Sequence, residues 1–158
     1  MSLPKGFAQH FSQVEYFMKK ALEQAKKAFS LDEVPVGCVI VKDGKIIARA
    51  HNKKEKRQNA TAHAEIEAIN KASKKLNNWH LDGADVYVTL EPCAMCVGAM
   101  INARVGHLYF GAWEPKFGAC GSVVNLFENA FNHKISFKGG ILEKDCAALL
   151  KQFFKGKR

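Results

Sequence analysis

Residues 85–103 read DVYVTLEPCAMCVGAMINA, and their pattern indicates the fold class most clearly. Its first six residues, 85–90, are mostly β-branched, aromatic or aliphatic and predict a buried strand. Pro92 follows, and residues from Cys93 to about Ala103 predict a helix, because a proline at a helix start removes an N–H that has no intrahelical partner there. A strand that leads at once into a helix is typical of a sheet covered by helices.

A hairpin precedes this unit in the chain. Residues 36–41, Val-Gly-Cys-Val-Ile-Val, form a short β-branched run that predicts a buried strand, and residues 46–50 predict its return partner. Between them, Asp43-Gly44 is a favoured two-residue turn because such turns need positive φ at both positions. The two strands are therefore expected to pair antiparallel.

Apolar residues at helical spacing predict the remaining helices, at about residues 9–29 and 142–154. A further helix follows a polar, basic loop at 51–62; Thr61 is its candidate cap, and it runs to about Lys75. Strands are expected at 107–111 and 134–137, separated by a long glycine-punctuated loop with at most one helical turn. Strands alternate with helices after the hairpin, so the sequence predicts an α/β fold with a five-stranded mixed sheet and helices on both faces.

The bulk properties narrow the class of protein. The chain has 158 residues, 47% of them apolar, and no Pro/Gly/Ser-rich linker, so we expect one domain over residues 1–158. No apolar run approaches the ~18–20 residues of a membrane span, and residues 1–11 lack the apolar core of a signal peptide. We therefore expect a cytoplasmic protein without a membrane anchor.

The cysteine count and the net charge point to possible partners. Five cysteines is an odd number, which favours metal ligation or burial over a disulfide framework. The net charge of +9 slightly favours a polyanionic partner over the alternative, a solvated lysine-rich surface that keeps the protein soluble.

Two short segments carry metal-capable side chains: His63-Ala64-Glu65, and Pro92-Cys93-Ala94-Met95-Cys96. Positions i and i+3 in a first helical turn lie on one face, so both sulfurs can reach one ion at roughly 2.3 Å. His63 can add a nitrogen from the neighbouring helix start. Three protein ligands leave a fourth position for water, which is the pattern of catalytic zinc sites.

Glu65 is the candidate proton carrier. Helix N-termini favour thiolate over thiol, and zinc lowers the pKa of its bound water toward ~7. The spacing of Glu65 from His63 aims its carboxylate near the metal but not onto it. There it can take a proton from the water and return it to a leaving nitrogen.

Each segment alone has other interpretations. Cys-x-x-Cys after a strand can be a redox pair or half of a four-cysteine structural zinc site. Cys38, Cys120 and Cys146 show no second paired spacing, so we expect them to be buried apolar residues. Taken together, the two segments match the His-x-Glu…Pro-Cys-x-x-Cys signature of zinc-dependent deaminases.

Longer segments resemble the family of bacterial tRNA-specific adenosine deaminases, in the cytidine/deoxycytidylate deaminase superfamily. They include VPVGC at 34–38, TAHAE at 61–65, TLEPCAMCVGAM at 89–100 and FF at 153–154, and the similarity covers nearly the whole chain. The resemblance implies a three-layer cytidine-deaminase-like fold and a homodimer. It also implies one zinc ion per subunit, bound by His63, Cys93 and Cys96, with Glu65 as the proton shuttle.

The resemblance further implies the reaction and the substrate contacts. The reaction is hydrolysis of adenosine to inosine by zinc-activated water at the wobble position of a tRNA anticodon stem-loop. The residues expected to bind substrate are Val36, Asn52, Ala64, Glu114, Lys116 and Phe154. Glu114 departs from the family pattern Gly-Ala-x-Asp-x-Lys; it is one methylene longer, which would shift a contact near the substrate sugar.

Basic and aromatic residues outside the motifs have two interpretations each. Basic clusters at 53–57 and 151–158 would contact anticodon-loop phosphates if they flank the active site, and otherwise form solvated faces. Trp113 is a stacking surface for a base or a loop anchor, and at least one of Phe153 and Phe154 is expected to pack in the core.

Two rival functions use the same features. A deaminase of free guanine or cytosine would need the same zinc site but has no use for the basic charge. A zinc-structured RNA-binding module would need no catalysis, and Glu65 argues against it because a structural site needs no unligated carboxylate beside it.

Overall fold

The computed structural model describes residues 5–157, without the side chains of residues 5–9 and 11. Of the stretch expected not to be a signal peptide, residues 1–4 lie outside this description, and so does Arg158. The elements in chain order are α1 (Lys5–Ser30), β1 (Gly37–Lys42), β2 (Lys45–His51), α2 (Lys54–Arg57), α3 (Ala64–Leu76), β3 (Ala84–Leu90), α4 (Ala94–Asn102), β4 (His107–Ala112), a 3-10 turn η1 (Leu126–Glu128), β5 (Ser136–Lys138) and α5 (Glu143–Lys155).

Five strands form one mixed sheet in the order β2-β1-β3-β4-β5. Strand β1 pairs antiparallel with both β2 and β3, whereas β3, β4 and β5 run parallel. The turn between β1 and β2 has positive φ at Asp43 and Gly44, as expected for an Asp-Gly hairpin. The predicted hairpin and five-stranded mixed sheet are therefore confirmed.

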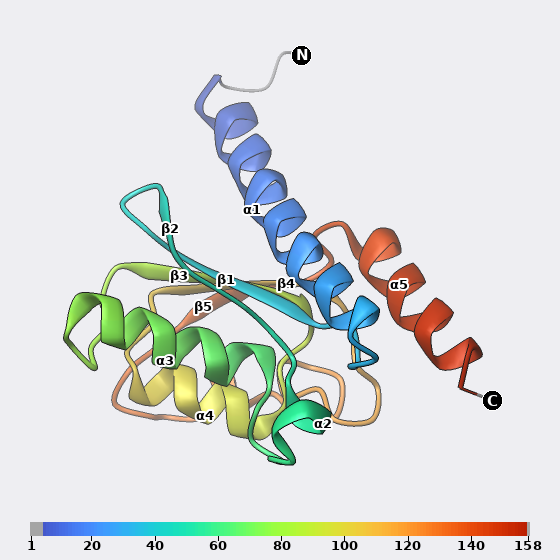
Figure 1. The fold of residues 1–158 in the computed structure, drawn as a ribbon. Helices are drawn as coiled ribbons and strands as arrows, with labels where there is room; N and C mark the ends of the chain where they lie inside the picture. Colours follow the sequence, from blue (N-terminus) through green and yellow to red (C-terminus); the bar gives the residue numbers. More distant parts are fainter. Residues whose placement is uncertain (1–4, 158) are drawn as a thin grey trace.

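Helices cover both faces of the sheet (Figure 1). Helices α1 and α5 lie on one face, and α3 and α4 lie on the other. Alternate residues of β1 enter the two cores: Cys38 and Ile40 face the α3/α4 side, while Val39 and Val41 face α1 and α5. Because this strand is buried on both faces, it reads in the sequence as a continuous apolar run. Among the described residues, no helix has the length and apolar content needed to cross a membrane.

Four local predictions need correction. The loop expected at 51–62 contains the four-residue helix α2. Thr61 does not cap α3: its hydroxyl group donates to Asn59 Oδ1, and His63 occupies the N-cap position. Pro92 precedes α4 rather than opening it, because Cys93 is the N-cap. The last strand, β5, also begins two residues later than expected, at Ser136.

Candidate functional site

The site lies where α3 and α4 begin. Both N-cap residues, His63 and Cys93, have extended backbone conformations and make no side-chain capping hydrogen bond. Their carbonyl groups accept the first helical bonds, from Glu67 and Val97 at 3.0 Å each. The imidazole and the thiol are therefore free of the usual capping role and point toward each other.

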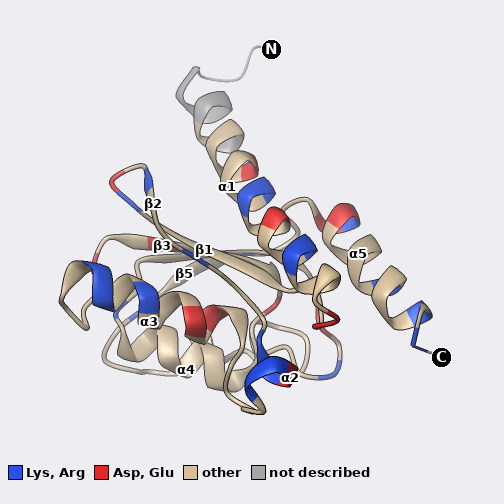
Figure 2. Ribbon diagram, in the orientation of Figure 1, with Lys and Arg blue, Asp and Glu red and all other residues tan. Residues whose placement is uncertain are grey.

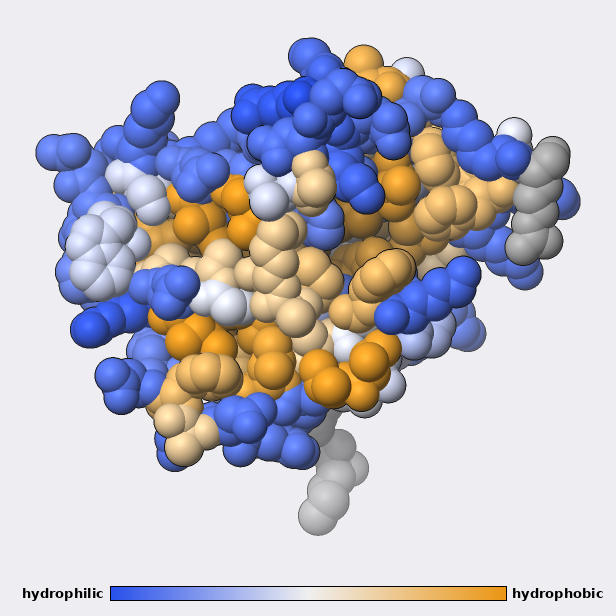
Figure 3. All heavy atoms as spheres, turned by 90° about the horizontal axis from the view of Figure 1, so that it is seen from below, coloured by the Kyte–Doolittle hydropathy of each residue, from blue (hydrophilic) through white to orange (hydrophobic). Residues whose placement is uncertain are grey.

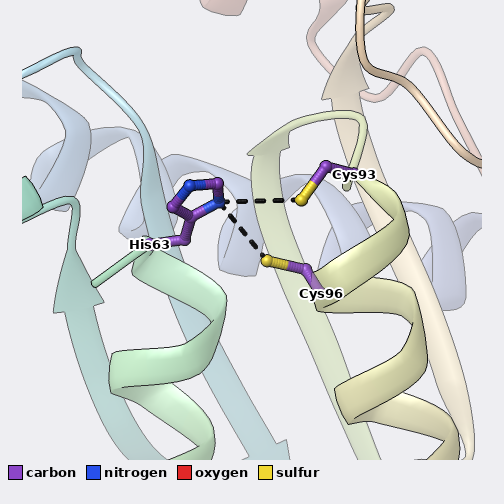
Figure 4. Close-up of side chains that lie close together, drawn as sticks. All are labelled: His63, Cys93 and Cys96. Carbon is purple, nitrogen blue, oxygen red and sulfur yellow. Dashed lines mark hydrogen bonds between the residues drawn. The ribbon is translucent and has the colours of Figure 1, made fainter. Parts of the chain in front are cut away.

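The three predicted metal ligands come together (Figure 4). His63 Nδ1 lies 3.7 Å from Cys93 Sγ and 3.6 Å from Cys96 Sγ, and all three donor atoms lie within 4.8 Å of one another. A tetrahedral zinc ion with usual bond lengths separates its nitrogen and sulfur ligands by roughly 3.5 Å. The donor set and its spacing thus fit zinc, and two of the three donors, His63 and Cys93, line the cavity described below.

Hydrogen bonds among the three donor side chains shift their pKa values. A hydrogen bond from the Cys96 thiol lowers the pKa of Cys93 to about 4, with a further contribution from His63. Cys96 keeps the shared proton and is buried, so its pKa is raised. The bond to Cys93 raises the pKa of His63. A divalent cation in this place would stabilise both thiolates, because metal ligation requires deprotonated sulfur.

Glu65 lies in the first turn of α3 and is only 4% exposed. Burial is the main cause that raises the pKa of its carboxyl group, while a backbone hydrogen bond and the charge of His63 act in the opposite direction. A carboxyl group whose pKa is moved toward neutrality can accept and return a proton in the same reaction.

A cavity of about 420 Å³ opens at this point. Its walls include His63, Glu65 and Cys93, together with five of the six residues predicted to bind substrate: Val36, Asn52, Ala64, Glu114 and Phe154. Lys116, the sixth, lies outside this lining; its backbone N–H donates to Glu114 Oε1 at 2.9 Å. The Glu114 carboxylate therefore closes a local turn in its own loop.

Five further residues line the cavity: Val34, Lys54, Leu90, Glu91 and Phe117. Lys54 belongs to the basic cluster at 53–57, which stands out in the sequence. Glu91 lies directly before the Pro-Cys-x-x-Cys motif, and the motif itself predicts no role for it. Phe117 is an aromatic residue with 70% of its surface exposed, in a loop without periodicity, so no pattern pointed to it.

The paired phenylalanines of α5 have different environments. Phe153 is buried and packs edge-on against Phe29, whereas Phe154 is half exposed and lines the cavity. The expectation that one of them belongs to the core is confirmed. Trp113 lies outside the cavity lining and packs edge-on against Phe110 at 4.9 Å, in keeping with a loop anchor.

The basic clusters are partly engaged within the protein. Figure 2 shows that α2 is a basic segment beside the beginning of α3. Arg57 pairs with Glu67 at 3.0 Å, and Lys157 pairs with Asp32 and lies over the Phe153 ring. Of the basic residues that the structure describes near the site, Lys54 is the one in the cavity lining.

The other cysteines behave as the sequence predicts. Cys38, Cys120 and Cys146 are free and at most 1% exposed. Burial raises the pKa of Cys146 to about 12 and raises that of the other two as well. They are therefore inert packing residues rather than ligands.

Comparisons with known proteins agree with this geometry. Residues 11–158 match the MafB19-like deaminase family. The tRNA-specific adenosine deaminase of Bacillus subtilis (strain 168) is 48% identical over 145 residues, which is 91% of this chain and 90% of the relative. A solved structure from a study of A-to-I editing by tRNA:A34 deaminases at the wobble position is 44% identical, with a TM-score of 0.82, covering 85% of this chain and 98% of the other.

A guanine deaminase from Nitrosomonas europaea is more distant, at 24% identity with a TM-score of 0.78 over 96% of this chain and 93% of the other, and shows the fold alone. Together the structures confirm the predicted cytidine-deaminase-like fold. Because the Bacillus subtilis relative is 48% identical over about nine tenths of both lengths, this chain belongs to the tRNA-specific adenosine deaminase family.

Proposed function

We propose that this chain hydrolyses adenosine to inosine at the wobble position of a tRNA anticodon. One observation carries the proposal: a metal-capable His/Cys/Cys group and a buried carboxyl group share one cavity in a chain 48% identical to a tRNA-specific adenosine deaminase. The proposed unit is a single deaminase domain.

The metal centre is proposed from the donor set. His63, Cys93 and Cys96 would hold one zinc ion per subunit, and their spacing supports this assignment. When bound, zinc would supply Lewis-acid activation of a water molecule at neutral pH.

Glu65 performs the proton transfers in this proposal. Its carboxylate takes a proton from the attacking water and delivers it to the amino group on C6 of the adenine. A C–O bond forms at C6, the C–N bond breaks, and the nitrogen leaves as ammonia. The buried position of Glu65 supports this role, because it keeps bulk water from exchanging the carried proton.

Asn52 is proposed to hold the base. Its amide is held by the backbone: Oδ1 accepts from the Lys54 N–H at 3.2 Å, and Nδ2 lies 3.5 Å from the Val34 carbonyl oxygen. A fixed amide in a cavity wall can select one pattern of donors and acceptors on a base. Val36 and Ala64 form apolar walls in this account.

The remaining proposed contacts concern the RNA around the base. Phe154 and Glu114 stand at the cavity, where they would meet the neighbouring nucleotide and the sugar. Lys116 would reach phosphate from outside the lining. Splayed bases beside aromatic and cationic side chains are typical of single-stranded RNA recognition.

A homodimer is part of the proposal. Figure 3, the view from below Figure 1, shows apolar side chains in a band across this face. Helix α4 keeps Met95, Ala99 and Ile101 partly exposed, and Val123 and Val124 are about half exposed. Exposed apolar surface of this kind supports association with a second copy.

The free cysteines support a reducing, cytoplasmic location.

The test is nucleoside analysis after incubation of the zinc-loaded protein with an anticodon stem-loop that carries adenosine at the wobble position. We expect one inosine per stem-loop, and none from a matched stem-loop whose only adenosines lie elsewhere in the loop. The Michaelis constant should rise with salt, because phosphate contacts release counterions. Turnover of free guanine or cytosine, with no inosine in any tRNA, would overturn the proposal.

A further inference from the structure

The short helix α2 is not capped by its own N-cap residue. It has four residues, far fewer than the ~12–15 that an isolated helix needs in water. Its N-cap residue, Lys53, makes no side-chain capping bond. The first backbone N–H groups of a helix need an acceptor from elsewhere in the structure.

Glu33 supplies that acceptor from 22 residues away. Its carboxylate accepts the N–H of Glu55 at 3.1 Å through Oε2, and the N–H of Lys56 at 2.6 Å through Oε1. Glu33 is 2% exposed, so these bonds are shielded from water. Charge-assisted bonds of this kind are stronger than those between neutral groups.

Glu33 is itself fixed by the end of α1. Its N–H bonds to the Ala28 carbonyl group at 2.9 Å, and the Asp32 N–H bonds to Phe29 at 3.1 Å. Asp32 has a left-handed backbone, with φ of 62°. This is a Schellman helix end, and it sets the direction in which Glu33 leaves α1. Figure 2 shows this acidic turn close to the basic α2.

The position of α2 decides where its cations stand. Lys54 lines the substrate cavity, and its N–H bonds to Asn52, the residue proposed to hold the base. The Lys53 N–H bonds to the Ala62 carbonyl group, immediately before His63. If α2 lost its acceptor, Lys54 would have to be ordered again each time RNA bound, at a cost in affinity.

We propose that Glu33 is a positioning residue for RNA binding, which holds α2 so that Lys54 faces the anticodon-loop phosphates. This inference rests on the proposed function and deepens it. Glu33 acts on the rim of the cavity and not on the ligands or on Glu65. Its loss should therefore weaken substrate binding and leave the chemical step unchanged.

The kinetic test compares Glu33→Gln with Glu55→Gln in the zinc-loaded protein. Both remove one negative charge, but the Glu55 side chain is exposed on α2 itself. We expect Glu33→Gln to raise KM for the anticodon stem-loop about tenfold, on the scale of a lost charge-assisted bond, with kcat within twofold. The KM of Glu33→Gln should also rise less steeply with salt than that of the wild type, as for a lost phosphate contact. Glu55→Gln should match the wild type. Equal effects of the two variants, or a fall in kcat alone, would overturn the inference.

A double-mutant cycle with Lys54→Ala tests whether Glu33 acts through Lys54. If it does, adding Glu33→Gln to Lys54→Ala raises KM no further. Multiplication of the two effects would contradict the proposal. Should Glu33→Gln fold poorly, Glu33→Asp keeps the charge but shortens the reach to α2, and the same outcomes apply to it.

Amide hydrogen exchange separates this inference from the proposed function. The amides of Glu55 and Lys56 should exchange at least tenfold faster in Glu33→Gln than in Glu55→Gln, whether or not the protein acts on tRNA. Unchanged exchange would overturn the positioning role. A wild type that makes no inosine would overturn the proposed function alone.

Discussion

The carboxyl group of Glu91 lies where a side chain at residue 118 would have to be. A Cβ built on Gly118 would stand 2.3 Å from Glu91 Cδ and 2.4 Å from both oxygens. Glu91 is 2% exposed and accepts the N–H groups of Glu114, Cys120 and Ser122, at 2.9, 3.0 and 3.1 Å. One buried carboxylate therefore holds the loop that brings Glu114 and Phe117 to the cavity.

Gly118→Ala should displace this carboxylate and loosen the loop. We expect a loss of roughly 1–3 kcal/mol in the free energy of unfolding, the usual range for overpacking, together with a higher KM. Gly156→Ala is the matched control, because its nearest atom would lie 3.5 Å from the new Cβ and its φ is −70°. Urea denaturation of both variants checks this, and equal stabilities would show that the contact is not tight.

Phe153 and Phe154 should separate stability from binding. Phe153→Ala removes a buried ring that packs on Phe29, and should cost about 3–5 kcal/mol of stability. Phe154→Ala should leave stability nearly unchanged but raise KM for the stem-loop, since this ring is half exposed at the cavity. Thermal unfolding and steady-state kinetics measure the two effects, and a reversed pattern would contradict the placement of the rings.

Much of the fold followed from patterns that are local in the sequence. The Asp43-Gly44 turn, the apolar run of β1 and the strand leading into Cys93 each depend on neighbours within a few residues. The metal group was also predictable, because Cys93 and Cys96 share one helix start and His63 begins another. Hydrophobic periodicity further placed α1, α3 and α5 within a few residues of their observed bounds.

The features that escaped prediction depend on partners distant in the chain. Glu33 accepts two N–H groups of helix α2 from outside the segment, and no spacing within residues 51–62 signals these bonds. Thr61 has the right residue type for a cap, but the backbone places His63 there instead. Phe117 reaches the cavity because Glu91 folds its loop inward, a contact that spans more than twenty residues.

Removal of zinc should destabilise the protein without unfolding it. Helices α3 and α4 bury Ala68, Ala72, Val97 and Met100 against the sheet, independently of the metal ligands. A bound ion at a thousandfold excess over its Kd adds about 4 kcal/mol, so chelation should lower Tm. The far-ultraviolet circular dichroism at 25 °C should persist. Complete unfolding on chelation, as in a zinc finger, would contradict this account.

Alkylation should distinguish the site cysteine at the cavity from the packing cysteines. Cys93 is partly exposed, whereas Cys38, Cys96, Cys120 and Cys146 are buried. Burial also raises the pKa of Cys146 to about 12, so it is a thiol at pH 8 and a poor nucleophile. Iodoacetamide should modify Cys93 first in the zinc-free native protein, and zinc should protect it. Peptide mass mapping that finds Cys146 modified as fast as Cys93 would refute this.

The most direct test of the proposed chemistry is the replacement Glu65→Gln, assayed for zinc by elemental analysis and for inosine by mass analysis of the stem-loop. The account predicts one zinc ion per chain, near-normal RNA affinity and a fall in kcat of about 10²–10⁴, the usual contribution of a proton-transferring group. Glu128→Gln, at an exposed position in η1 outside the cavity lining, should stay within a few-fold of the wild type. Undiminished inosine formation by Glu65→Gln, with its zinc in place, would contradict the account.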